Sequence, residues 1–117
     1  MRLDTSNQVL NASERNRLKI GPRRSNLAAI EAILYAEKIF DPPSLNDGDG
    51  HTESVTVTGA RLGDFVLPSW QGNTQELFLN GHVTSSDTVE VRFQNETGVT
   101  VNLSINRLRV MVFKRKQ

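Results

Sequence analysis

The residues of this chain whose types and spacing could do chemistry are few, and their densest group lies in one short loop. The segment NDGDGHTE, residues 46–53, contains Asp47, Asp49, His51 and Glu53. Carboxylate oxygens at this density are the donors that Ca²⁺ or Mg²⁺ prefers. The order of an EF-hand loop is missing, because His51 stands at its fifth position and no helices flank the segment. We therefore interpret the segment as a simple loop and expect no metal and no cofactor.

A catalytic site is equally hard to build from this sequence. There is no cysteine, and the two histidines, His51 and His82, lie in a Gly/Asp loop and just after a turn signal. Neither stands at a spacing typical of a catalytic triad, and no Gly-rich phosphate-binding loop precedes a helix. We expect no catalytic residues and predict that the protein is not an enzyme.

The elements that would position any site in this chain are strands. From Thr52 onward, apolar and polar residues alternate in short segments separated by turn residues. The alternating segments are 54–58, 77–79, 89–94, 99–106 and 108–113, with turns expected at 59–64, 80–81, 84–87, 95–98 and 106. A period of two with one apolar face per strand predicts an all-β fold, a small antiparallel β-sandwich of jelly-roll-like form.

Composition limits the alternatives. The chain has 117 residues, of which 37% are hydrophobic, enough for one domain with a thin core. The sequence contains no run of 18 apolar residues, so it predicts no membrane-spanning helix. Its N-terminal part lacks the apolar stretch of a signal peptide. Without cysteines, stability must come from packing and assembly.

The first 34 residues differ from the rest. Residues 1–25 show no sustained periodicity and predict an extended arm, while Ser25 is a plausible N-cap for a short helix at 26–34. In the segment YAEKIF, 35–40, this helix could give way to a strand. The predicted organisation is an arm at 1–34 followed by a sandwich at 35–117.

Charge is distributed unevenly along the chain. Residues 1–25 carry a net +4 and residues 107–117 a net +5, whereas residues 26–106 carry a net −8. Basic ends on an acidic body predict contact with an acidic surface, which could be another copy of the chain, although solvated tails remain the alternative. The arm residues that we expect to bind are Arg15, Arg17, Lys19, Arg23 and Arg24.

The last alternating segment, 108–113, has apolar residues on both of its faces. Met111 and Phe113 lie on the face that also carries Arg107 and Arg109. Either this strand is covered by the N-terminal segment or it faces a neighbouring subunit. We therefore add Met111 and Phe113 to the candidate binding residues.

Two glycines interrupt the β-pattern in TGARLGD, residues 58–64. Gly59 ends a strand, and Gly63 is expected to have a positive φ before Asp64 turns the chain back into a sheet. Such a corner moves a strand from one sheet to the other. We expect Asp64 to contribute only a turn hydrogen bond, so that its loss costs less than a Cβ at Gly63.

Three stretches together suggest a family. They are FDPPSLNDGDGHTESVTVTGARLGDFVLPS, LFLNGHVTSSDTVEVRFQNETGVTVNL and LRVMVFKR, in that order and spacing, covering about residues 36–114. They resemble a small β-domain of tailed-bacteriophage structural proteins, in which a strand directly precedes Asp-Pro-Pro-Ser. The resemblance implies a strand at 35–40. It also implies a capsid decoration (cement) protein, or alternatively a receptor- or glycan-binding module of a head fibre or tail.

The decoration role fixes the expected partners. It implies a protein made in the bacterial cytoplasm that binds the major capsid protein on the virion surface, with a homotrimer as the expected assembly. The alternative role would use Trp70 and Phe78 as sugar-stacking residues on exposed loops, although a Trp next to Pro68 more often caps a core or an interface. A nucleic-acid partner is disfavoured, because only Phe113 lies among basic residues as stacking readers require. No membrane contact is expected.

Overall fold

The computed structural model describes residues 30–116, and within this range the chain is all-β with no helix. Its strands are β1 (Ile30–Phe40), β2 (Gly50–Thr56), β3 (Phe65–Trp70), β4 (Phe78–Ser85), β5 (Thr88–Gln94) and β6 (Asn106–Arg115). They form two three-stranded antiparallel sheets, ordered β1-β6-β3 and β2-β5-β4. The all-β sandwich expected from the alternating segments is confirmed.

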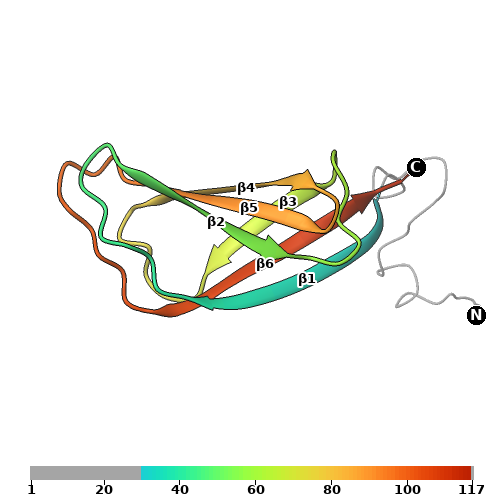
Figure 1. Ribbon diagram of the computed structural model, residues 1–117, viewed down its shortest axis with the longest axis horizontal. Helices are drawn as coiled ribbons and strands as arrows, with labels where there is room; N and C mark the ends of the chain where they lie inside the picture. Colours follow the sequence, from blue (N-terminus) through green and yellow to red (C-terminus); the bar gives the residue numbers. More distant parts are fainter. Residues whose placement is uncertain (1–29, 117) are drawn as a thin grey trace, which may run out of the picture. The chain divides into compact units, whose positions relative to one another are not determined.

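The chain winds between the two sheets in the manner of a jelly roll. In Figure 1 the sheet β2-β5-β4 forms the upper layer, and β1 and β6 run along the lower one. β1 pairs with β6, and β2 pairs with β5. In sequence order the pair β2–β5 is therefore nested within the pair β1–β6. Six strands are arranged in this way, where a full jelly roll has eight.

The core is formed by the inward side chains of both sheets. Val89, Val91 and Phe93 of β5 and the alternate residues Leu108, Val110 and Val112 of β6 are fully buried. The central strand of each sheet therefore supplies the most deeply buried residues, because it is flanked on both sides. The alternation that predicted these strands is the alternation of core and outward positions.

An aromatic cluster closes one end of this core. Phe40, Trp70 and Phe93 pack with ring centroids 5.7–6.4 Å apart, in tilted and edge-to-face arrangements. His51 stacks on Phe40 at 5.3 Å. The cluster joins β1, β3 and β5, and so fastens the two sheets together at the end of β1.

The corner predicted at 59–64 is confirmed. Gly59 and Gly63 have φ values of 99° and 94°, and the segment carries the chain from β2 in one sheet to β3 in the other. Asp64 does more here than close a turn. Its side chain is fully buried and accepts hydrogen bonds from Lys114 Nζ at 2.8 Å and from the backbone N–H of Arg61 and Arg115.

Four local predictions are wrong, two of them in β1 and β4 and two in the loop between β5 and β6. Residues 30–34 belong to β1 rather than to a helix at 26–34, because pairing with β6 places Leu34 against the core; residues 26–29 lie outside the described range. Residues 30–34, which were expected to belong to the arm, are therefore part of a strand of the sandwich. The Asn80-Gly81 pair is no turn, since β4 continues through it and pairs with Arg92 and Val91.

The segment 99–105 is no strand either. Only Val101 pairs there, in an isolated bridge with Leu45. The buried Asn95 organises this loop instead, donating from Nδ2 to the carbonyls of Leu45 and Val99 and accepting from Thr97. Because a side chain supplies these hydrogen bonds, the loop needs no partner strand, and β6 begins at Asn106, where a turn was expected.

Candidate docking surface

The outward faces of the two sheets have opposite character. On the sheet β2-β5-β4 this face is polar apart from Phe78 at the start of β4; its other side chains are Thr52, Ser54, Thr56, Asn80, His82, Ser85, Thr88, Glu90, Arg92 and Gln94. On the sheet β1-β6-β3 the outward positions carry mostly large apolar side chains. One sheet thus has a polar outer face and the other has a largely apolar one.

The strand register places the apolar residues of the second sheet in two adjacent rows. Ile33, Phe113 and Phe65 lie side by side on β1, β6 and β3. The next outward row consists of Tyr35, Met111 and Leu67. We call these six residues the apolar face.

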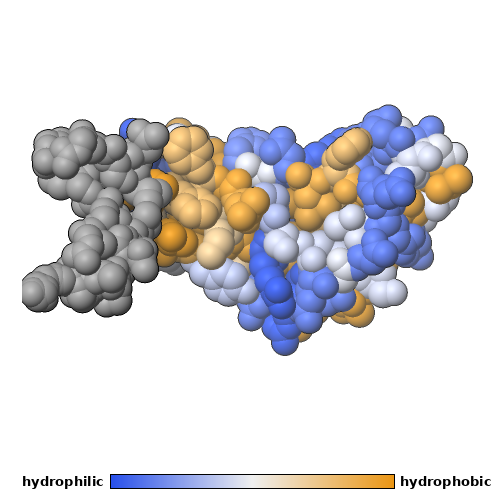
Figure 2. Space-filling model, turned by 180° about the vertical axis from the view of Figure 1, so that it is seen from behind, coloured by the Kyte–Doolittle hydropathy of each residue, from blue (hydrophilic) through white to orange (hydrophobic). Residues whose placement is uncertain are grey.

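The apolar face is open to solvent. Phe65 is 64% exposed, and Ile33, Tyr35 and Leu67 are each more than half exposed. At roughly 100 Å² for each half-exposed large side chain, the six expose on the order of 500–600 Å², the size of the largest patch on a typical monomer. Figure 2 shows hydrophobic residues gathered in the left part of the described surface on one side of the molecule.

A polar row borders the apolar face. Glu37 of β1 lies opposite Arg109 of β6, with Ser69 of β3 beyond it. The Glu37 carboxylate is 3.3 Å from Arg107 Nη1 and 4.0 Å from Arg109 Nε. The Arg109 Nε atom is buried and makes no hydrogen bond within residues 30–116. The row therefore has one acid for two guanidinium groups.

A shallow hollow joins the two regions. Its volume is about 150 Å³, and its lining includes Tyr35, Leu67, Met111 and Arg109. The Tyr35 hydroxyl donates a hydrogen bond to Glu37 at 3.2 Å. Partial desolvation, followed by this hydrogen bond, raises the pKa of Tyr35, so the phenol stays neutral. The hollow offers apolar contact on one side and hydrogen-bonding groups on the other.

The structure brings together two of the predicted binding residues and leaves five untested. Met111 and Phe113 lie in the centre of the apolar face, on the middle strand of the sheet. The predicted arm residues, which are Arg15, Arg17, Lys19, Arg23 and Arg24, lie outside the described residues.

Four members of the apolar face were not predicted from sequence. Ile33 was assigned to a helical stripe, and Phe65 and Leu67 sit in an apolar run whose two faces cannot be told apart. Tyr35 gave the one available signal. In YAEKIF, Tyr35 alternates with the core-facing positions Ala36 and Phe40, which marks it as outward once the segment is known to be a strand.

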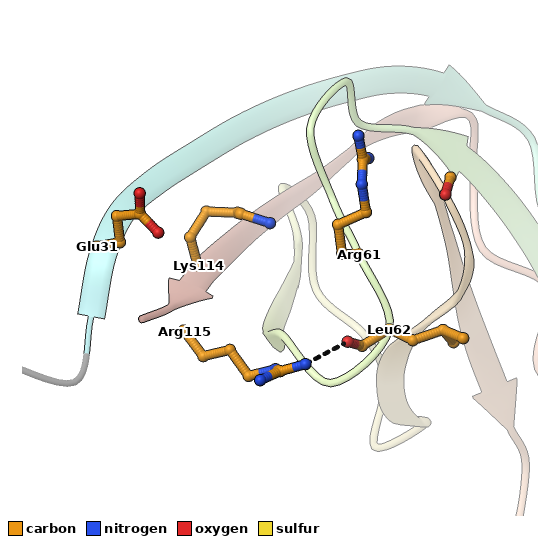
Figure 3. Close-up of a pocket in the computed structure, with 6 residues that line it drawn as sticks. Glu31, Arg61, Leu62, Lys114 and Arg115 are labelled. Carbon is orange, nitrogen blue, oxygen red and sulfur yellow. Dashed lines mark hydrogen bonds between the residues drawn. The ribbon is translucent and has the colours of Figure 1, made fainter. Parts of the chain in front are cut away.

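A second, larger pocket lies at the corner. Its volume is about 520 Å³, and Glu31, Arg61, Leu62, Lys114 and Arg115 line it together with Ser86 (Figure 3). Its cations are already engaged, since Lys114 pairs with Asp64 at 2.8 Å and Arg61 with Asp87 at 3.0 Å. Arg115 donates to the Leu62 carbonyl at 3.4 Å. These bonds hold the corner against β6, and we assign the pocket no ligand.

The acidic segment 46–53 does not gather its carboxylates around one point. Glu53 points toward β1, where it pairs with Lys38 at 2.6 Å and with His51 at 2.9 Å. Burial raises the pKa of Glu53, but hydrogen bonds from Lys38 and His51 outweigh it and lower the pKa overall. Asp47 accepts from the backbone N–H of Gly98. Within residues 30–116, no three His, Cys, Asp or Glu side chains lie together as metal ligands would.

The two aromatic residues of the alternative sugar-binding role are separated. Trp70 is at the end of β3 and only 7% exposed, which confirms the expectation that it caps the core and leaves it unavailable for stacking on a sugar. Phe78 is exposed, but it begins β4 in the other sheet. Trp70 serves the aromatic cluster of the core instead.

Neither the protein-family models nor the curated proteins include a match to this chain. Residues 30–116 also contain no helix with the length and hydrophobicity needed to cross a membrane. The candidate site therefore stands on its own geometry, and its leading feature is the apolar face.

Proposed function

We propose that this protein is a capsid decoration protein of a tailed bacteriophage, which binds the outer shell of the virion and stabilises it. The observation that carries the proposal is the asymmetry of the sandwich. A sheet that exposes Ile33, Tyr35, Phe65 and Leu67 on one side is unfavourable in a free monomer and favourable in an assembly. The resemblance of residues 36–114 to phage structural β-domains supplies the kind of assembly.

The proposed mechanism is mechanical. A rigid sandwich bound across neighbouring capsid subunits buries surface at each contact, and a standard contact buries about 1,600 Å². Shell expansion under the pressure of packaged DNA would have to break these contacts, so each bound copy raises its free-energy cost. This role uses surfaces and requires no catalytic group.

The motif residues fit a role as scaffold. The glycines of TGARLGD adopt positive φ at the corner, and Asn95 of QNETG organises the loop between β5 and β6. The signature that suggests the family thus builds turns and loops. The surface that binds the shell has to be sought elsewhere on the molecule.

Copy number tests the proposal. Virions of the phage that encodes this chain would be purified, and the chain would be quantified by mass spectrometry against the major capsid protein. We expect a copy number comparable with that of the capsid protein. A few copies per particle would indicate a fibre or tail module, and complete absence from the virion would overturn the proposal.

A direct binding assay complements this measurement. Purified chain added to shells that lack it should bind to saturation and raise the temperature at which the shells disrupt. Binding without any stabilisation would contradict the mechanical role while leaving a virion location intact.

A further inference from the structure

We infer that the apolar face of the sheet β1-β6-β3 is a self-association surface, which packs against the same face of a second copy of this chain. The inference goes beyond the proposed function, which names no partner for this face. It does not depend on the capsid, because it rests on the sandwich alone. The polar sheet β2-β5-β4 and the loops would then be left for other contacts.

The geometry of the face is self-complementary. A two-fold axis parallel to β6 places each row of one copy over the same row of the other, and β1 over β3. The row of Ile33, Phe113 and Phe65 then meets its own equivalent, as does the row of Tyr35, Met111 and Leu67. Apolar side chains face apolar side chains over the whole patch.

The bordering polar row is the least favourable part of the same arrangement. In each copy Glu37 neutralises part of the charge of Arg107 and Arg109. The two-fold axis places Arg109 of one copy opposite Arg109 of the other, and Glu37 opposite Ser69, so this row adds no attraction across the contact.

The area is close to what a stable contact needs. A standard interface buries about 800 Å² per partner, and the apolar face with its polar row approaches this value. Its two apolar rows also match their own equivalents across a two-fold axis, so a second copy supplies a complementary surface. A second copy is therefore favoured over a shell protein as the occupant.

The experiment measures self-association of the full chain by sedimentation equilibrium over a wide range of concentrations. The test variant carries Phe65→Thr and Leu67→Thr, which remove apolar area from exposed strand positions while keeping good β-formers. The matched control is Phe78→Thr. Phe78 also begins a strand, is 65% exposed against 64% for Phe65, and lies outside the apolar face.

We expect the unaltered chain and the control to form assemblies heavier than the 13.1 kDa monomer, with equal affinity. In the test variant the dissociation constant should rise by about 100-fold or more, because both copies lose apolar contact. A monomer at every concentration would overturn the inference, as would an assembly that the test variant leaves intact. Circular dichroism would verify that each variant folds.

A second measurement uses the unaltered protein and so does not depend on the fold of a variant. Met111 lies on the apolar face, and the only other methionine is Met1. Oxidation of Met111 by hydrogen peroxide should slow as concentration favours the assembly. A rate independent of concentration would contradict the inference. No phage particle is present in either assay, so failure here leaves the copy-number test of the proposed function unaffected.

Discussion

The corner between β2 and β3 gives the sharpest test of how this fold is held together. Asp64 lies there with a side chain that is fully buried. It accepts hydrogen bonds from Lys114 Nζ at 2.8 Å, from Arg61 N at 2.9 Å and from Arg115 N at 3.1 Å. One carboxylate therefore joins the corner to β6, the central strand of the opposite sheet from β2. Replacing Asp64 by Ala removes all three bonds at once.

The size of the effect follows from what is left behind. Lys114 is only 15% exposed and would lose its counter-ion. Breaking a buried ion pair by removing one partner costs about 3–5 kcal/mol, and the two freed backbone donors make the upper part of that range the expectation. For a domain of this size the unfolding midpoint should fall by roughly 10–20 °C.

The comparison with Gly63→Ala makes the prediction specific. Gly63 has a φ of 94°, where a Cβ costs about 1–2 kcal/mol. The new Cβ would also lie 2.6 Å from Arg115 Nε, but that exposed side chain can move away. The sequence predicts that Asp64→Ala loses less stability than Gly63→Ala. The structure predicts the opposite, that Asp64→Ala loses more.

Chemical denaturation of the full chain, followed by circular dichroism, measures these differences. Asp87→Ala serves as the control, since Asp87 lies in the turn between β4 and β5 and pairs with Arg61 of the corner. Its side chain is 47% exposed, so its removal should cost less than that of Asp64. Lys114→Met completes a double-mutant cycle with Asp64→Ala. If Asp64→Ala costs no more than Gly63→Ala, or if the cycle shows no coupling, the assignment of Asp64 as a buried structural anchor is wrong.

Three further predictions follow from the same contacts. Burial raises the pKa of Asp64, but its hydrogen bonds, led by that from Lys114, lower it overall, and the pKa of Glu53 is lowered as well. Since both folded-state pKa values are depressed, the stability that the two carboxylates contribute is present above about pH 4 and should be lost as pH falls through those pKa values. A midpoint of unfolding that does not change on acidification would refute this prediction. Asn95→Ala should lower the free energy of unfolding by roughly 2–4 kcal/mol, because the loop loses four hydrogen bonds at a fully buried site. A loss smaller than that caused by replacing an exposed Asn would contradict the role of Asn95 in the loop. Lys38→Met should lower the free energy of unfolding by about 1–2 kcal/mol, since it leaves Glu53 paired with His51 alone. It should also raise the pKa of Glu53, measured by NMR titration. An unchanged pKa would exclude the pair with Lys38 as the cause of the lowered pKa.

The sequence was sufficient for the fold class because a sandwich depends on a local signal. Val89, Val91 and Phe93 alternate strictly with polar residues, and these three are among the fully buried side chains. The two glycines of the corner were equally readable, because positive φ is a backbone requirement that few residues other than glycine meet. Signals of this kind need no knowledge of what lies across the core.

The errors arose where tertiary contacts decide between two local patterns. Ile30, Ile33 and Leu34 fit a helical stripe, but pairing with β6 selects the strand. Asn80-Gly81 is a strong turn signal in isolation, yet β4 runs through it alongside β5. The role of Asp64 was underestimated for the same reason, because its partner Lys114 is 50 residues away in sequence.

The candidate surface shows most clearly what alternation cannot provide. Period two identifies two faces of a strand, but it does not say which sheet a strand joins or which strands are its neighbours. Met111 and Phe113 could be recognised singly, whereas the apolar face exists only because the register aligns them with Ile33, Tyr35, Phe65 and Leu67. The same register leaves the outer face of β2-β5-β4 polar apart from Phe78. An apolar outer face on one sheet and a polar one on the other cannot both be optimal in water, and this imbalance is the physical reason to expect that the sandwich functions in contact with another protein surface.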